Sequence, residues 1–365
     1  MKDKIITISF LVIIFGLFLA NLLIPDVELS YSERRRLAQF PEFSVKTVFD
    51  GTFMTDFDTY TTDQFTGRET FRGIKTFVDR NIMRKQDTNG LFQAEGGIFT
   101  IEYPLRADKV VHICRRLSAL YDSYLTGMNV YYSIVPDKNY YVPDPDSYLL
   151  MDYRKLESIM AENMPRGANY INLFEVLELD NYYLSDGHWR QETLKPVVDK
   201  LNMGMGNSQL FDPEQYEQFK YEPFYGAYYG QLAGMAAPDT LIWLENQITR
   251  DAQITSLGHP GQENLPIYYQ GGLGGMDSYD VYLYGAQPLI ILDNPHNLSG
   301  RELILFRDSF GSSLAPLLLE GYSRIILVDL RYITQELLAD YITFTDQDVL
   351  CIFSTSVINN SDIIR

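Results

Sequence analysis

The stretch Leu303-Ile304-Leu305-Phe306-Arg307-Asp308-Ser309-Phe310-Gly311-Ser312-Ser313 decides the fold of this chain. Its first four residues are apolar and predict a buried strand, because the run is too short for a helix of its own. A polar turn with Ser309 follows, and the apolar run 314–319 then predicts a helix. Such a strand–turn–helix unit exposes the turn side chain above the sheet edge and directs the N–H groups of the helix start to the same point.

Ser309 has two interpretations at this turn. A nucleophile needs an exposed hydroxyl and backbone donors that stabilise the oxyanion formed on attack, and the predicted turn offers both. Ser is also a common turn and N-cap residue, so the motif on its own favours a structural role. A second motif is needed to decide between the two.

That second motif is Ser185-Asp186-Gly187-His188-Trp189, in a chain with only four His and two Trp. Asp and His are the groups that a Ser nucleophile lacks: a base for its proton, and a carboxylate that fixes the imidazole tautomer. The alternative is a surface turn with a half-buried His. Together, the two motifs favour a catalytic triad in the chain order Asp186, His188, Ser309.

The rest of the chain predicts an α/β fold. Its 365 residues, 46% of them apolar, are enough for a sizeable core. Helical spacing at 108–126 and 153–163 alternates with apolar runs, which indicates a parallel sheet with helices on both faces. The strands that we expect lie at 130–135, 168–173, 303–306, 325–328 and 349–353.

Four segments follow from this pattern: a transmembrane anchor at 1–24, a stalk at 25–45, a helical and hairpin segment at 46–107, and the α/β domain at 108–365. The stretch 203–300 is rich in Gly, Tyr and Pro, and we interpret it as an insertion of short strands and loops. In the third segment, a stripe of Phe residues at helical spacing is expected to lie in a core or to pack on the main domain.

Charge restricts the partners of the protein. A formal net charge of −18 argues against nucleic acid, because no basic face is available for a phosphate backbone. The uncharged run from Ile5 to Ile24 is long enough to cross a bilayer, and Lys2 and Lys4 favour a cytoplasmic N-terminus. A retained anchor is favoured over a cleaved signal peptide. The run Arg34-Arg35-Arg36 would then lie outside, with a structural role or in contact with anionic head groups.

Neither a metal nor a cofactor is predicted. Cys114 and Cys351 lie far apart in apolar runs, so we expect buried free thiols and no cysteine metal site. A metal held by Asp186 and His188 is a minor alternative.

Six short motifs, in this order, resemble the bacterial DHHW protein family, a relative of the SGNH-hydrolase-like O-acetyltransferases such as the periplasmic enzymes that acetylate alginate. The motifs are Tyr31-Ser-Glu-Arg-Arg-Arg-Leu-Ala-Gln-Phe-Pro41, Asp63-Gln-Phe-Thr-Gly-Arg68, Val135-Pro-Asp-Lys138, Asp186-Gly-His-Trp189, Arg307-Asp-Ser-Phe310 and Val328-Asp-Leu-Arg-Tyr332. The resemblance implies a flavodoxin-like SGNH-type sheet with Ser309 as nucleophile, His188 as base and Asp186 as its carboxylate. Two departures stand out: Gly187 replaces the His of the family motif, and Arg307 stands where the wider group often has Gly.

The resemblance implies a membrane-anchored O-acyltransferase on the outer side of a bacterial cell membrane, which moves acetyl groups to a cell-envelope polysaccharide or exopolysaccharide. A membrane-bound O-acyltransferase would supply the acyl group. A secreted carbohydrate esterase with the same triad and a non-catalytic surface protein are the alternatives. Arg331, Lys138 and Trp189 are candidate substrate contacts, and an ion pair is the alternative role of Arg331.

Overall fold

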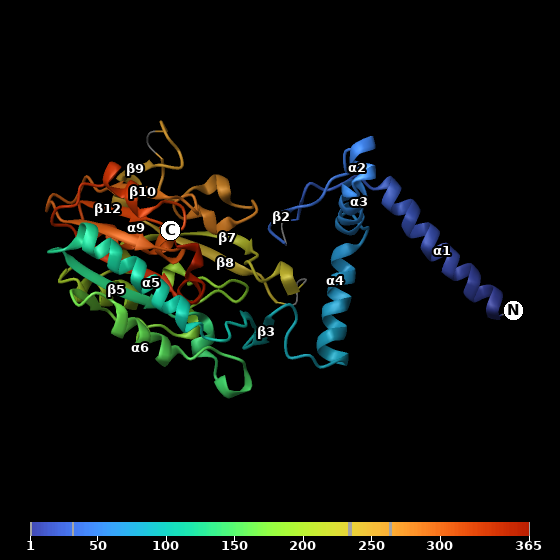
Figure 1. Cartoon of the computed structure of the whole chain (residues 1–365), viewed down its shortest axis with the longest axis horizontal. Coiled ribbons are helices and arrows are strands. Elements are labelled where there is room, and N and C mark those ends of the chain that lie inside the picture. Colours follow the sequence, from blue (N-terminus) through green and yellow to red (C-terminus); the bar gives the residue numbers. More distant parts are fainter. Residues whose placement is uncertain (1, 31–32, 233–235, 263–264, 365) are drawn as a thin grey trace.

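A seven-stranded sheet forms the centre of the protein, in the order β6-β5-β13-β11-β12-β10-β9 (Figure 1). The computed structural model describes residues 2–30, 33–232, 236–262 and 265–364, so Tyr31 and Ser32 of the first family motif lie outside the described residues. The first five strands in this order are mutually parallel. The strands are β5 (Asn129–Val135), β6 (Ala168–Tyr170), β9 (Gln253–Ser256), β10 (Leu289–Asp293), β11 (Glu302–Arg307), β12 (Arg324–Val328) and β13 (Asp348–Ser354).

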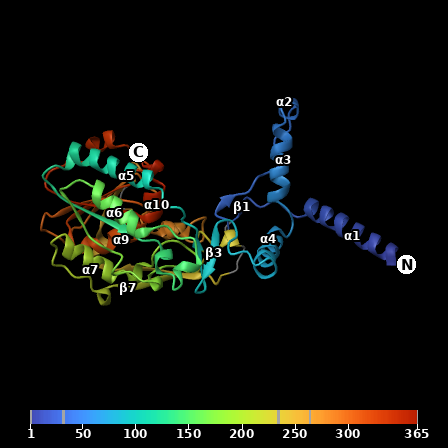
Figure 2. The ribbon, with the colours of Figure 1, turned by 60° about the horizontal axis from the view of Figure 1, so that its bottom comes forward.

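Helices cover both faces of the sheet, as predicted. Along β11, Leu303 and Leu305 pack into one apolar cluster, whereas Ile304 and Phe306 pack into the other. Because both faces are covered, the strand is apolar throughout instead of alternating with polar residues. The first face carries α7 (Lys195–Gly204) and α9 (Phe310–Leu318); the second carries α5 (Ala107–Leu120), α6 (Tyr153–Asn163) and α10 (Thr355–Asn359), with α5 and α7 on opposite sides in Figure 2.

Two details differ from the prediction. Strands β9 and β10 come from the stretch 203–300 that the sequence placed outside the sheet. They extend it beyond β12: β10 is antiparallel to β12, and β9 is antiparallel to β10 and forms the edge. These strands join the sheet because the backbone of β10 pairs with β12, and no sequence pattern in 203–300 predicts that pairing. The second detail is strand β6, which ends at Tyr170 and not at 173 as expected. Pro196 lies in the first turn of α7, where its missing N–H has no intrahelical partner to lose.

The remainder of 203–300 lies beside the sheet. It contains a hairpin of β7 (Glu217–Phe224) and β8 (Asp239–Glu245), the short helix α8 (Gln247–Asp251), and a single turn of 3-10 helix at Ser278–Val281. The hairpin and this turn pack on the first face of the sheet, because Phe224, Leu241 and Tyr279 belong to its apolar cluster. The site described below is partly built from these loops.

Helices α1 to α4 lie to one side of the body (Figure 1). Helix α1 (Lys2–Leu23) is long and apolar enough to cross a membrane, and none of its residues is buried. A membrane anchor and a signal sequence share these properties. After α1 come β1 (Leu29–Ser30), β2 (Arg35–Arg36), α2 (Val45–Phe49), α3 (Thr52–Asp63), α4 (Arg68–Phe77), and the predicted hairpin of β3 (Leu91–Ala94) and β4 (Gly97–Thr100).

The phenylalanines of α2 to α4 do not form a core. Phe49 is 88% exposed, and Phe71 and Phe77 are both more than half exposed. Phe53 and Phe57 are half-buried, and their rings stack on each other. The prediction of a buried stripe is therefore wrong for Phe49, Phe71 and Phe77, because the side of α2 and α4 that carries them is left uncovered.

Candidate active site

The backbone at the end of β11 presents Ser309. This residue follows the strand, which ends at Arg307, and precedes the first residue of α9, Phe310. The carboxylate of Asp308 fixes the turn: its Oδ1 accepts a hydrogen bond from Phe310 N at 3.0 Å, and its Oδ2 accepts one from Ser354 N at 2.7 Å. Asp308 thus stabilises the turn and ties it to the end of the neighbouring strand β13.

The structure brings Asp186, His188 and Ser309 together. Nε2 of His188 lies 2.7 Å from Oγ of Ser309, and Nδ1 lies 2.6 Å from Oδ1 of Asp186. The same oxygen of Asp186 accepts the backbone N–H of His188 at 3.0 Å, and Oδ2 accepts that of Ala227 at 2.7 Å. The row of hydrogen bonds has the geometry that a base and its orienting carboxylate need beside a Ser nucleophile.

Asp186 is held as a carboxylate. Its side chain is 1% exposed, and burial by itself would raise its pKa. The neighbouring His188, the guanidinium of Arg34 and the N–H of Ala227 outweigh burial and hold the pKa of Asp186 well below its usual range. An ionised carboxylate at this position stabilises the imidazolium that forms when His188 takes a proton.

Two aromatic rings pack against the imidazole ring of His188. The ring of Tyr279 stacks on His188 with 4.0 Å between centroids and 15° between planes, and Phe310 lies 5.0 Å away. The hydroxyl of Tyr279 is 2.8 Å from Oγ of Ser313, which also accepts a hydrogen bond from Nε1 of Trp189 at 2.8 Å. The sequence did not reveal Tyr279, because it is one of 27 Tyr and follows no motif.

Neither a family model nor a curated protein matches the sequence. Among solved structures, a DHHW family protein from Eubacterium siraeum matches with a TM-score of 0.63 at 18% identity, over 76% of this chain and 97% of that one. This chain has the fold of a DHHW family protein. Two structures of Bacillus cereus PatB1, one with a sulfonyl adduct, match with TM-scores of 0.57 at 13% and 14% identity, over 73% of this chain and 97% and 96% of theirs. The predicted resemblance is thus confirmed at the level of the fold.

The departure from the DHHW motif at Gly187 has a physical explanation. A Cβ atom at this position would lie 2.3 Å from the hydroxyl oxygen of Tyr228, which is far below van der Waals contact. Tyr228 therefore occupies the space that any side chain at position 187 would need. A Tyr from the stretch 203–300 thus fills the space beside Gly187, and His188 still contacts both Asp186 and Ser309.

Arg307, the second departure, is accommodated by another glycine. Its side chain is fully buried, and one guanidinium nitrogen is 3.3 Å from the carbonyl of Asp308 and 3.4 Å from Oδ2 of Asp329. A Cβ atom on Gly311 would lie only 2.6 Å from Cβ of Arg307. The stem of Arg307 thus packs on the first turn of α9, directly behind Ser309.

The three candidate substrate contacts have other partners. Trp189 is completely buried and donates a hydrogen bond to Ser313, and its contact with substrate stays a prediction. Arg331 donates from two nitrogens to Asp329, at 2.8 and 2.7 Å, which is the ion pair named as its alternative. A contact of Arg331 with substrate stays a prediction.

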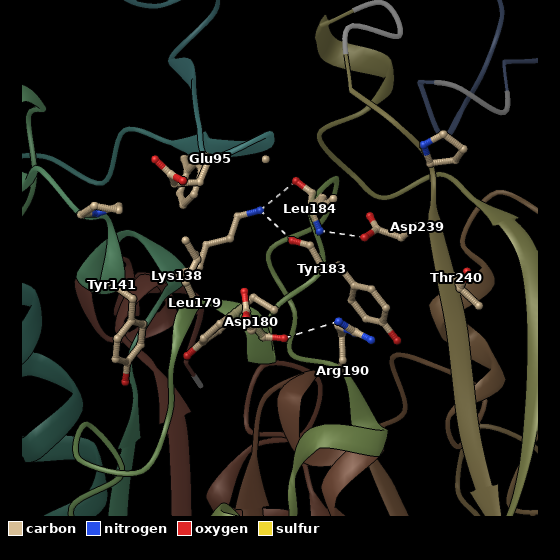
Figure 3. Close-up of a pocket in the computed structure, with 15 residues that line it drawn as sticks. Glu95, Lys138, Tyr141, Leu179, Asp180, Tyr183, Leu184, Arg190, Asp239 and Thr240 are labelled. Carbon is tan, nitrogen blue, oxygen red and sulfur yellow. Dashed lines mark hydrogen bonds between the residues drawn. The ribbon is translucent and has the colours of Figure 1, made fainter.

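Lys138 lies at a separate cavity of about 730 Å³. Neither Ser309 nor His188 lines this cavity; Tyr183, Leu184 and Arg190 are among the residues that do. The Lys138 side chain extends to the backbone carbonyls of Tyr183 and Leu184, at 2.9 and 3.1 Å (Figure 3). Its Nζ also lies 4.8 Å from the centre of the Phe99 ring. The two hydrogen bonds fix the backbone at Tyr183 and Leu184, just before Asp186. A role of Lys138 in substrate binding stays a prediction.

Lys138 should make stability depend on pH. Burial lowers the pKa of Lys138 from its ordinary 10.5 to about 7, although the negative charges of Asp186 and Asp239 act to raise it. Between these values the unfolded chain binds a proton that the folded chain lacks, so the free energy of unfolding rises with pH. We expect Lys138→Met to flatten this rise, measured as melting temperature against pH from about 7 to 10.

The exposed Lys220 provides the matched control, because its ammonium lies in solvent. Lys220→Met should leave the pH dependence of the melting temperature unchanged. An equal slope in Lys138→Met and the wild-type protein would show that Lys138 keeps its proton over this range.

Proposed function

We propose that this protein is an O-acyltransferase that carries an acetyl group on Ser309 and transfers it to a hydroxyl of a cell-envelope polysaccharide. The observation that carries the proposal is the row of hydrogen bonds from Asp186 through His188 to Ser309, at 2.6 and 2.7 Å. A turn at the carboxyl end of a parallel strand is also where ligands bind in open α/β sheets.

The reaction would proceed in two halves. His188 takes the hydroxyl proton while Oγ of Ser309 forms a bond to the carbonyl carbon of an acyl donor. The bond between that carbon and the leaving group of the donor then breaks, and the leaving group departs with the proton from His188. A sugar hydroxyl then attacks the acyl-serine, gives its proton to His188, and releases Ser309 with its proton restored. The backbone N–H of Ser309 would be one donor to the oxyanion, because the N–H groups of Phe310 and Gly311 are already bonded to Asp308.

The location and partners belong to the same proposal. Helix α1 would anchor the chain in the membrane, with the body outside the cytoplasm. Because acetyl-CoA is a cytoplasmic donor, a membrane-bound O-acyltransferase would deliver the acyl group from across the bilayer. Water in place of the sugar would make the same chemistry an esterase, and the lifetime of the acyl-enzyme distinguishes the two.

The full chain in detergent should release a burst of one nitrophenolate per molecule from p-nitrophenyl acetate and gain the mass of one acetyl group. Ser309→Ala should abolish both the burst and the mass gain, because no other described hydroxyl is bonded to Nε2 of His188. A polysaccharide acceptor should accelerate loss of the acetyl group if the enzyme is a transferase.

Ser312→Ala is the matched control. Its hydroxyl lies in the first turn of α9, three residues after Ser309. It is buried and has no hydrogen-bond partner among the described residues, so the burst should persist. A burst in Ser309→Ala would exclude Ser309 as nucleophile. PatB1 has been solved with a sulfonyl adduct, so a sulfonyl fluoride is a second probe of Ser309. If the folded protein reacts with neither the acetate ester nor phenylmethylsulfonyl fluoride, the result would favour the non-catalytic alternative.

A further inference from the structure

We propose that Arg34, in the segment that follows α1, is a positioning residue of the active site. The segment consists of β1, β2 and the described turn residues Glu33 and Arg34, and we call it the Arg34 hairpin. It lies between the body and α3–α4 (Figures 1 and 2). The inference rests on the proposed function of Ser309 and extends it, because it makes the membrane-proximal hairpin a part of the catalytic machinery.

The guanidinium of Arg34 contacts the carboxylate of the triad directly. One nitrogen lies 3.3 Å from Oδ2 of Asp186 and donates to the carbonyl of Tyr225 at 3.2 Å. The other donates to Oδ2 of Asp277 at 2.8 Å. The Arg34 side chain is only 14% exposed, so these bonds form in a partly desolvated place where charge-assisted hydrogen bonds are strong.

Asp277 connects the same guanidinium to the other side of the imidazole. Its Oδ1 accepts a hydrogen bond from the backbone N–H of Tyr279 at 3.0 Å, and the Tyr279 ring stacks on His188. Arg34 therefore joins the two groups that hold His188, namely the carboxylate at Nδ1 and the turn that carries the stacked ring. Without the cation, two carboxylates would face each other; burial and the charge of Asp186 raise the pKa of Asp277, while Arg34 lowers it.

The residues on either side of Arg34 hold the hairpin in place. Glu33 accepts hydrogen bonds from Arg68 and Arg72 of α4, and Arg72 also donates to the carbonyl of Gly230 in the body at 2.6 Å. Arg35 forms two hydrogen bonds to Asp63 of α3, at 2.6 and 2.8 Å.

The backbone of Arg34 supports the same conclusion. Its φ of 52° lies in the left-handed region, which residues other than Gly rarely adopt. This constrained backbone, together with the ion pairs of Glu33 and Arg35, fixes the position from which the Arg34 side chain reaches Asp186 and Asp277. The planar fork of arginine spans two carboxylates at once, which an ammonium cannot reproduce.

The test compares Arg34→Ala with Arg36→Ala in the full chain in detergent. Both remove one positive charge from the hairpin, but Arg36 is exposed to solvent. We expect the rate constant for acylation of Ser309 to fall about 10²-fold in Arg34→Ala, as for a misplaced catalytic group, and to stay unchanged in Arg36→Ala. Guanidinium ion should restore part of the rate in Arg34→Ala, and Arg34→Lys should remain slow.

A second measurement separates this inference from the proposed function. The proton on Nδ1 of His188, bonded to Asp186, is expected to give a far-downfield NMR signal whether or not Ser309 reacts, and Arg34→Ala should weaken or broaden it. A wild-type acylation rate in Arg34→Ala would overturn the role of Arg34 and leave the proposed function intact. If the wild-type protein fails to acylate, an unchanged Nδ1 signal in Arg34→Ala would overturn the inference independently.

Discussion

Asp186→Asn is expected to slow acylation of Ser309 by about three to four orders of magnitude, with the fold intact. Asp186 Oδ1 is 2.6 Å from Nδ1 of His188, so the carboxylate keeps the proton on Nδ1 and leaves Nε2 free to accept one from Ser309. An amide that turns its NH₂ group toward Nδ1 would favour the other tautomer, in which Nε2 carries the proton and cannot act as a base.

The measurement is the burst rate with p-nitrophenyl acetate, together with the melting temperature as a check on folding. Asp180→Asn, at an exposed position, removes the same charge without touching the triad and should acylate at the wild-type rate. A loss of less than about tenfold in a folded Asp186→Asn protein would show that the carboxylate does not set the tautomer of His188.

Gly187→His, which restores the family motif, is expected to damage the protein. The first side-chain carbon alone would come within 2.3 Å of the Tyr228 hydroxyl, and overpacking in a well-packed region costs about 1–3 kcal/mol. Because Gly187 lies between Asp186 and His188, the backbone shift should also misplace both groups and lower the acylation rate by about 10²-fold. Melting temperature and burst rate report the two effects separately.

The double variant Gly187→His with Tyr228→Ala tests the explanation, because it empties the space that the new side chain needs. We expect it to recover part of the lost melting temperature and acylation rate relative to Gly187→His. Tyr228→Ala alone provides the reference for the cavity it leaves. If the double variant is no better than the sum of its single changes, the clash between positions 187 and 228 is not the cause.

The sequence was sufficient to predict those features that depend on residues close together in the chain. All five expected strands of the sheet are present. Four of them are short apolar runs bounded by turns, whereas β6 is a three-residue edge strand with no buried residue. The geometry at Asp186, His188 and Ser309 was also foreseeable, since two short motifs of unusual composition needed only the parallel sheet to bring them together.

Contacts between distant parts of the chain could not be foreseen. Arg34 and Asp277 are 243 positions apart, and neither belongs to a catalytic pattern. The three consecutive Arg residues were noticed, but their roles depend on partners that only the fold supplies: Arg34 turns to Asp186, and Arg35 to Asp63. The partial exposure of Phe71 and Phe77 escaped prediction for the same reason, because helical spacing identifies an apolar face without showing what covers it.

The position of the Arg34 hairpin also limits how far the active site can stand from a bilayer. The last residue of α1 is Leu23, and Arg34 follows it by eleven positions. Even a fully extended chain of this length spans only about 40 Å. If α1 remains in the membrane, this span limits the distance that an acyl group from a membrane-bound donor would have to cross to reach Ser309.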